Sequence, residues 1–328
     1  MKTLPGLALA IAIAVVAFAL GRVVPIVGGP VFGIVIGMLV TLVRKPAPSF
    51  APGIKFASKQ LLQLSIIVLG ANLSLHEIVG SGLRSLPVML GTLAIVLIAA
   101  YVVGRALGIE RDMRRLLGVG TAICGGSAIA ALSTVIEASE ADIAYAISTV
   151  FLFNVVAVLT FPPLGHLLAL SQQAFGLWAG TAINDTSSVV AAAFVYGHVA
   201  GNEAVIVKLT RTTLIIPIVL FYAGKRLWQR RADHGSIDWK SIVPWFILWF
   251  VAAALLNTFG VIPASWHGAL TTIALFTIVI ALSGVGLSAD FARMRAAGFR
   301  PIVLGFVLWV LIAFASLGIA RVTGLGGS

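Results

Sequence analysis

A run of five polar residues lies in the middle of an apolar stretch, in the sequence GTAINDTSS (180–188), flanked by FGLWA and VVAAAFV. The run consists of Asn184, Asp185, Thr186, Ser187 and Ser188. It offers one amide, one carboxylate and three hydroxyls, which together bind ions and small polar solutes. Because the flanks indicate that water is scarce there, we interpret the run as a binding segment for a substrate.

Two cationic residues follow in VIVKLTRTTLI (205–215), where Lys208 and Arg211 lie three residues apart and so share roughly one helix face. Their side chains could extend to the outer membrane interface, or point inward and pair with Asp185; the sequence favours the inward orientation. Two cations against one carboxylate leave a positive surplus, which suits an anionic substrate, and a guanidinium matches the geometry of oxyanions. Asp185 would then either hold Arg211 in place or carry a coupling proton or sodium ion.

The composition indicates that these residues lie inside a membrane. Hydrophobic residues make up 60% of the 328 and charged residues 10%, whereas soluble domains carry about 25% charged residues. Mean hydropathy is +1.09, and apolar stretches recur that reach the roughly 20 residues needed for a membrane-spanning helix. The sequence predicts an all-α polytopic membrane protein with about eleven membrane segments. They lie near 4–21, 25–43, 59–76, 84–104, 112–137, 141–166, 173–198, 203–224, 241–260, 266–288 and 300–320.

The connections between these segments are short, and the longest polar linker is 225–240. The first segment follows Lys2, as in a signal peptide, but no small-residue cleavage site follows it, so we expect an uncleaved helix. The single cysteine, Cys124, excludes an internal disulfide and a cysteine-based metal site. We expect no metal and no cofactor.

The net charge of +11 is concentrated in four loops that alternate with nearly uncharged ones, as the positive-inside rule requires. The loops contain Arg44, Lys45, Lys55 and Lys59; Arg105, Arg111, Arg114 and Arg115; Lys225, Arg226, Arg230, Arg231 and Lys240; and Arg293, Arg295 and Arg300. This pattern places the N-terminus in the cytoplasm and the C-terminus outside. The basic excess therefore indicates topology, with anionic membrane lipid rather than nucleic acid as the partner.

Two internal similarities predict an inverted repeat, which locates the site in many transporters. The sequence GTAICGGSAIAA (120–131) resembles GTAINDTSSVVAA (180–192), and VLGANLSLHE (68–77) resembles ALSGVGLSAD (281–290). By the charge pattern the first Leu-Ser segment runs outward and the second inward, as an inverted repeat requires.

The Gly-Thr-Ala-Ile segments are predicted to be broken helices at membrane depth, interrupted by Gly120, Gly125 and Gly126 in one and by Gly180 with Asn184 and Asp185 in the other. A broken helix exposes backbone groups and is tolerable only beside a cavity or buried protein, and its new N-terminus favours an anion. Alternatively, the small residues only permit close helix packing. The functional interpretation adds five candidate residues from the first segment: Thr121, Cys124, Gly125, Gly126 and Ser127.

Each broken segment either crosses the membrane or returns to the same side as a re-entrant hairpin. Both alternatives fit the charges, because neither EASEAD (137–142) nor PPLGHLLALSQQ (162–173) carries Lys or Arg. The sequence slightly favours full crossing over nine spans plus two hairpins.

Four strings, GVGTAICGGSAIAAL (118–132), IVKLTRTTLIIP (206–217), LLQLSIIVLGANLSL (61–75) and ALSGVGLSADF (281–291), resemble the YeiH-like family of bacterial inner-membrane proteins designated sulfate exporters. The resemblance covers nearly the whole chain and implies the superfamily of cation:proton antiporters and bile-acid symporters, with a core of broken helices beside a flatter panel. Relatives carry a His-Glu pair where this chain has Asn184-Asp185, so the substrate does not carry over with the resemblance.

These observations predict a secondary transporter of a small anion, such as sulfate or an organosulfonate, that works by alternating access, with Asp185 as the coupling group. The expected core is 59–76, 112–137, 173–224 and 266–288. A channel and a cation/proton exchanger using Asp185 are the alternatives. An enzyme is not indicated, because an aspartyl protease needs a second intramembrane carboxylate and Ser127 has no histidine at its depth. The oligomeric state, including a homodimer, stays open.

Overall fold

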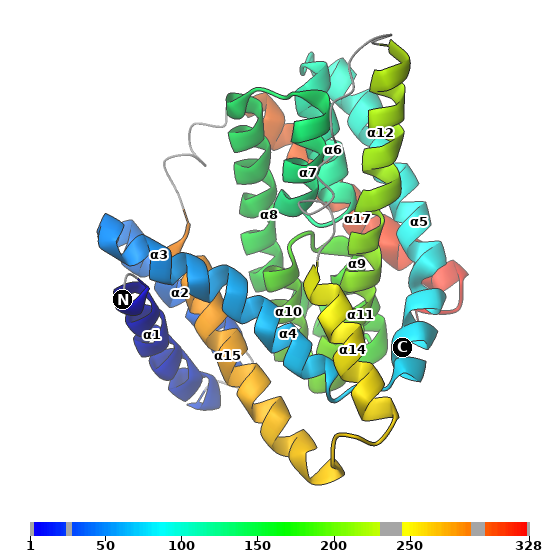
Figure 1. Ribbon diagram of the computed structural model, residues 1–328. Helices are drawn as coiled ribbons and strands as arrows, with labels where there is room; N and C mark the ends of the chain where they lie inside the picture. The colour runs from blue at the N-terminus through cyan, green and yellow to red at the C-terminus, as the bar shows by residue number, and fades with distance from the viewer. Residues whose placement is uncertain (1–2, 24–27, 230–244, 290–298, 327–328) are drawn as a thin grey trace.

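The computed structural model describes residues 3–23, 28–229, 245–289 and 299–326, and the regular structure in these ranges is helical (Figure 1). The sequence features at 230–240 and at Asp290, Arg293 and Arg295 lie outside the described residues. The helices are α1 (Leu4–Val23), α2 (Gly28–Val43), α3 (Ala51–Lys55), α4 (Leu62–Gly70), α5 (Leu75–Ala106), α6 (Arg111–Ala122), α7 (Gly126–Ile136), α8 (Glu140–Leu167), α9 (Gln172–Ala182), α10 (Thr186–Tyr196), α11 (His198–Thr213), α12 (Ile215–Gln229), α14 (Trp245–Thr258), α15 (His267–Leu287) and α17 (Phe299–Val322).

Six stretches of helix in the described ranges are long and apolar enough to cross a membrane, and four shorter apolar helices accompany them. Large apolar side chains such as Val16, Ile98 and Trp249 are exposed on their outer faces, where lipid rather than water would cover them. The predicted class, an all-helical polytopic membrane protein, is therefore confirmed at this level.

Several helices begin earlier than predicted. The segment expected at 59–76 begins at Ala51, because α3, a π-helical turn (Phe56–Leu61) and α4 are continuous. Helix α5 begins at Leu75, because the Ser74 hydroxyl accepts the Glu77 N–H and the Glu77 carboxylate accepts the Ser74 N–H. This reciprocal capping box satisfies donors that a helix start otherwise leaves unpaired.

The segment 173–198 reverses direction, so the full crossing favoured by the sequence is wrong for it. The side-chain oxygen of Gln172, at the start of α9, accepts the N–H groups of Val199 and Ala200 at the start of α11. Helices α9 and α11 also run in the same direction, since Gly176 lies against Ala200 and Gly180 against Val207. Both ends of α9–α10 therefore lie at one end of the bundle, and the two helices form a hairpin.

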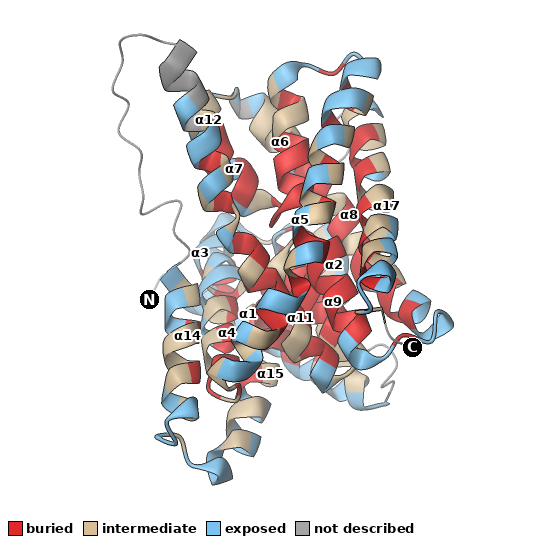
Figure 2. Cartoon of the chain, turned by 90° about the vertical axis from the view of Figure 1, so that its right-hand side faces the viewer, coloured by how far each residue is buried: buried red, intermediate tan, exposed pale blue. Residues whose placement is uncertain are grey.

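The segment 112–137 forms a second hairpin that enters from the opposite end. Helix α6 runs back along α5, with Arg114 against Gly104, and α7 returns to the short turn that starts α8. In Figures 1 and 2, α6 and α7 lie at the upper end of the bundle and α9 lies below them. We call the two turns, residues 123–125 and 183–185, the tips; they meet midway along α8.

The helix breaks involve fewer residues than predicted, since only 123–125 and 183–185 lie between the paired helices. Gly125, between α6 and α7, has φ +69° and ψ −124°, a conformation that only glycine adopts without strain. Gly120 and Gly180 lie inside continuous helices, where their missing side chains allow close packing against Ile129 and Val207. At these two positions the packing interpretation is correct.

The helices pack in two groups. The hairpin group comprises α5 to α12 and α17, and the panel group comprises α1 to α4, α14 and α15. Buried residues concentrate in the middle of the hairpin group, in α6 and α9 (Figure 2). Helix α4 packs on α14 and α15, and α15 also packs on α1 and α2, where Gly37 and Gly286 bring α2 and α15 into backbone contact.

The two groups are offset along the helix direction. In Figure 1 the upper ends of α2, α3 and α15 lie about level with the middle of α8, whereas α6, α7, α8 and α12 extend well above them. At the lower end, α14 and α15 extend beyond α10 and α11. The tips consequently lie near the upper ends of the panel helices.

We predict that Gly125→Ala lowers the midpoint of thermal unfolding of the purified protein, because alanine at this φ stores about 1–3 kcal/mol of backbone strain and its Cβ lies 3.3 Å from Val150. Gly126→Ala is the matched control, since nothing lies within 4 Å of an added Cβ there. Equal midpoints for the two variants would show that the tip does not require glycine at 125.

Candidate functional site

Lys208 joins the two tips. Its side chain is 0% exposed, and its ammonium donates to the carbonyl oxygens of Ile123 at 2.9 Å and Ile183 at 2.7 Å. Ile123 and Ile183 are the residues that terminate α6 and α9. One cation on α11 therefore binds the ends of two helices that enter from opposite ends of the bundle.

Arg211, one helical turn further along α11, is also completely buried. Its Nε donates to the carbonyl oxygen of Ala122 at 2.7 Å, at the end of α6. Its two terminal nitrogens, Nη1 and Nη2, are buried without a hydrogen-bond partner in the structure. Burying guanidinium nitrogens without acceptors costs free energy, so this part of Arg211 is available for an acceptor that binds from outside the chain.

Helix dipoles explain how two cations are tolerated here. The C-terminus of an α-helix carries roughly half a negative charge, from carbonyls without intrahelical partners. The C-termini of α6 and α9 converge on Lys208 and Arg211, and stabilise them in place of carboxylates. Two partial charges of this size amount to about one negative charge, which is less than the two positive charges of Lys208 and Arg211.

Asp185 does not pair with Arg211 as the sequence suggested. Among the described residues, the ion pairs within 4.0 Å lie elsewhere, at Asp112. Asp185 caps α10: its carboxylate accepts the Ser188 N–H at 3.1 Å and the Ser187 hydroxyl. Ser187 and Ser188 are buried and donate hydrogen bonds to this carboxylate. The carboxylate therefore already occupies the N-terminus of α10, which would otherwise favour another anion.

Asn154 of α8 fixes the second tip. Its side-chain oxygen accepts the N–H groups of Asn184 at 3.1 Å and Asp185 at 3.3 Å. Asn154 is 2% exposed and lies midway along α8, where a lone amide between apolar residues was the only signal. The side-chain oxygen of Asn184 is buried and unpartnered, so it is a further polar group at the tips.

The first tip leaves a helix N-terminus open. Helix α7 has no side-chain cap, Gly126 is half-buried and Ser127 is exposed. Thr121 and Cys124 are buried beside them. Asp185 and Thr186 are half-buried at the other tip. All twelve candidate residues therefore lie at or next to the tips, and four of them are accessible from the surface.

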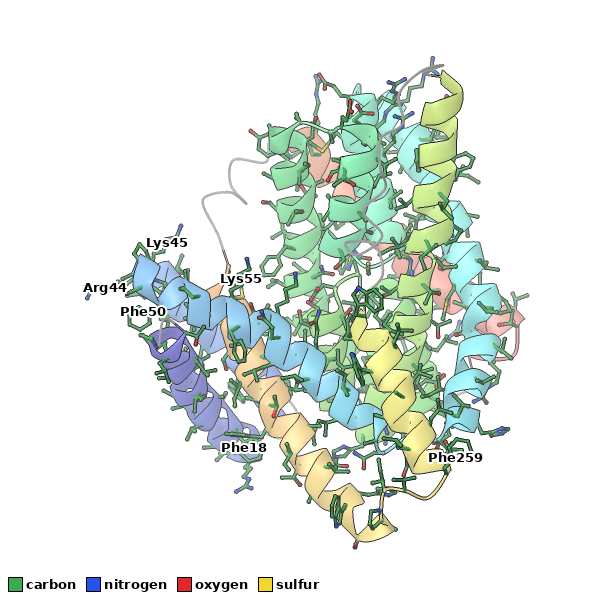
Figure 3. The ribbon with its side chains drawn as sticks, viewed as in Figure 1. Phe18, Arg44, Lys45, Phe50, Lys55 and Phe259 are labelled. Atoms are coloured by element: carbon green, nitrogen blue, oxygen red, sulfur yellow. The ribbon has the colours of Figure 1, made fainter. Side chains whose placement is uncertain are left out.

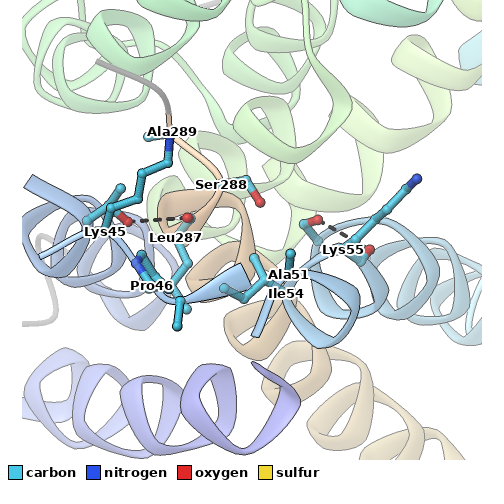
Figure 4. Close-up of a pocket in the computed structure, with 11 residues that line it drawn as sticks. Lys45, Pro46, Ala51, Ile54, Lys55, Leu287, Ser288 and Ala289 are labelled. Carbon is cyan, nitrogen blue, oxygen red and sulfur yellow. Dashed lines mark hydrogen bonds between the residues drawn. The ribbon is translucent and has the colours of Figure 1, made fainter. Parts of the chain in front are cut away.

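A pocket of about 250 Å³, lined by no residue of the tips, lies at the upper ends of α2, α3 and α15 (Figure 4). It is lined by Lys45, Lys55, Ser288 and neighbouring residues, and the Thr41 hydroxyl bonds the Leu287 carbonyl in its wall. Arg44, Lys45 and Lys55 lie at this end of the panel group and Phe259 at the other (Figure 3). Its residues come from the basic loops that indicated topology, so we do not take it as the substrate site.

Comparison with known proteins shows the family. The profile described as conserved hypothetical protein 698 matches residues 5–305. A UPF0324 membrane protein from Fusobacterium nucleatum is 40% identical to this chain over 98% of both chains. One from Streptococcus pyogenes is also 40% identical, over 99% of this chain and 98% of the relative. A UPF0324 membrane protein of Clostridium tetani is 37% identical over 95% of each chain. These names specify a membrane protein and no substrate. The chain therefore belongs to the family of conserved hypothetical protein 698, the UPF0324 membrane proteins.

Proposed function

We propose that this protein is a secondary transporter that carries a small oxyanion through a site at the two tips. The observation that carries the proposal is Arg211, whose terminal nitrogens are buried without an acceptor. Buried guanidinium nitrogens without acceptors cost free energy, and a bound oxyanion would supply the acceptors that the chain does not.

The charges around Arg211 favour an anion over a cation. Lys208 and Arg211 contribute two positive charges, and Asp185 contributes one negative charge that is already bonded to Ser187 and Ser188. The uncapped N-terminus of α7 adds a partial positive charge with backbone donors. A cation would be repelled by this set, whereas an oxyanion would find a guanidinium edge, backbone N–H groups and the Ser127 hydroxyl.

Sulfate is the first substrate to test. A tetrahedral oxyanion accepts several hydrogen bonds at once and matches the two terminal nitrogens of a guanidinium. Organosulfonates present the same group of oxygens and are the next candidates.

The arrangement of the helices supports a carrier rather than a channel. In this proposal nine segments cross the membrane and the two hairpins are re-entrant, with their tips at mid-depth in protein, where non-helical backbone is tolerated. The polar groups gather at one depth and do not line a continuous path. Opposed hairpins of inverted orientation are the geometry in which alternating access exposes one site to each side in turn.

The offset between the two groups suggests the direction of movement. We propose that the hairpin group slides against the panel group, with α2, α10 and α15 at the contact. If the basic ends face the cytoplasm, as the positive-inside rule requires, the hairpin group stands displaced toward the cytoplasm. The N-terminus is then cytoplasmic and the C-terminus is outside.

We predict that Arg211→Gln reduces sulfate exchange by about 10- to 150-fold, since a charge-assisted hydrogen bond contributes about 1.5–3 kcal/mol. The measurement is radiolabelled sulfate counterflow in liposomes that contain the purified protein. Arg115→Gln is the matched control, because Arg115 bonds Asp112 at 2.9 Å, away from the tips.

Undiminished exchange in Arg211→Gln would remove this residue from the site. Absence of exchange in the unsubstituted protein with sulfate, thiosulfate and methanesulfonate, at every pH and sodium concentration tested, would contradict an anion carrier and favour a cation exchanger using Asp185.

We predict that Asp185→Asn keeps the fold but abolishes coupling of anion flux to a proton gradient. Asparagine caps helices about as well as aspartate, so the unfolding midpoint should stay within a degree or two, whereas the titratable carboxylate is lost. Asp185→Ala should also lose the cap, at about 1 kcal/mol. The measurement compares anion uptake driven by an imposed pH gradient with counterflow exchange. Unchanged gradient-driven uptake in Asp185→Asn would exclude Asp185 as the coupling group.

A further inference from the structure

We propose that the Lys208 ammonium takes the place of a coupling metal cation at the tips, so that the cation that holds the two hairpins together is covalently part of the chain. If the ammonium replaces a coupling metal ion, anion transport needs no sodium; this consequence rests on the proposed function. The structural part stands independently, because it concerns what binds the carbonyl oxygens of Ile123 and Ile183.

The ligands of the ammonium are those of an alkali-metal site. In transporters with broken helices, unwound backbone carbonyls and half-helix C-termini coordinate the coupling ion, because carbonyl dipoles replace its hydration shell. Here the two carbonyl oxygens that terminate α6 and α9 lie 2.9 and 2.7 Å from Lys208 Nζ. Each carbonyl comes from a different hairpin, so a cation at this point bridges the two tips.

The position of the ammonium is fixed by packing. Helix α11 lies in close contact with α9, where Gly180 faces Val207 and the Ala204 carbonyl, and the whole Lys208 side chain is buried. The ammonium has three donors, and the contacts to Ile123 and Ile183 use two. The third is available to a bound anion.

The charges around Lys208 disfavour a free metal ion at this position. The charged and ionisable groups that interact with it are Arg211 on its own helix, Cys124 at the first tip and Asp185 at the second. Both neighbouring cations would repel a third positive charge, and the oxygens of Asp185 already accept from Ser187 and Ser188.

The test is to remove the ammonium and offer a free cation in its place. Lys208→Ala leaves a cavity lined by the two carbonyl oxygens, whereas Lys208→Met fills the same space with an apolar chain of similar length. Thermal unfolding of each purified variant is measured in sodium chloride, methylammonium chloride and choline chloride at equal ionic strength. We expect sodium or methylammonium to raise the midpoint of Lys208→Ala by at least about 2 °C over choline, and to leave Lys208→Met and the unsubstituted protein unchanged.

Two results would overturn the inference: a Lys208→Ala midpoint that is the same in all three salts, or a sodium-specific rise in the unsubstituted protein. The second measurement remains decisive if Lys208→Ala does not fold, since a protein with a built-in cation should show no sodium-specific stabilisation. Neither readout involves transport, so they test the built-in cation even if no transported anion is found.

Discussion

The fold depends on how two buried cations on one helix are compensated. Lys208 and Arg211 are completely buried and bond backbone carbonyls at the ends of α6 and α9. A carbonyl at a helix end has no intrahelical partner, so each helix break leaves an acceptor, and each cation needs one. The breaks and the cations therefore require each other: a continuous α6 or α9 would leave the cations without acceptors, and an apolar α11 would leave the carbonyls without donors.

The same interaction gives the two hairpins unequal chemical properties despite their similar sequences. At the second tip Asp185 caps α10 and Asn154 holds the turn, so the polar groups are largely satisfied within the chain. At the first tip Gly125 replaces a capping side chain, and the N-terminus of α7 stays open. Two similar segments thus yield one capped tip and one uncapped tip, and Arg211, which bonds the end of α6 through its Nε, keeps two buried terminal nitrogens without an acceptor.

The division into a hairpin group and a panel group places this polar centre beside the contact between the two groups. Small residues such as Gly33, Gly37 and Gly286 bring α2 and α15 into backbone contact, and close packing of this kind stabilises helix association in membranes. The panel helices thereby pack closely on one another, and the hairpin group has a large apolar core of its own. A second apolar cluster, which includes Ile34 of α2 and Val190 of α10, joins the two groups. In the transporter proposed above, one group would move against the other along this cluster.

The sequence by itself determined the membrane class and the helical content, and it identified 180–188, Lys208 and Arg211 as candidates. These follow from composition and from the cost of charge in an apolar environment, which are local properties. Only the tertiary structure decided that both broken segments reverse, that Asp185 caps α10 and does not pair with Arg211, and that Asn154 and the carbonyls of Ile123 and Ile183 join the candidate site. A backbone carbonyl has no sequence signature, and a hairpin and a crossing helix bury the same residues at the same depth. Whether a segment forms a hairpin or crosses depends on which neighbouring groups supply hydrogen bonds to its broken helix ends. Those neighbours are brought together only by the packing of all the helices.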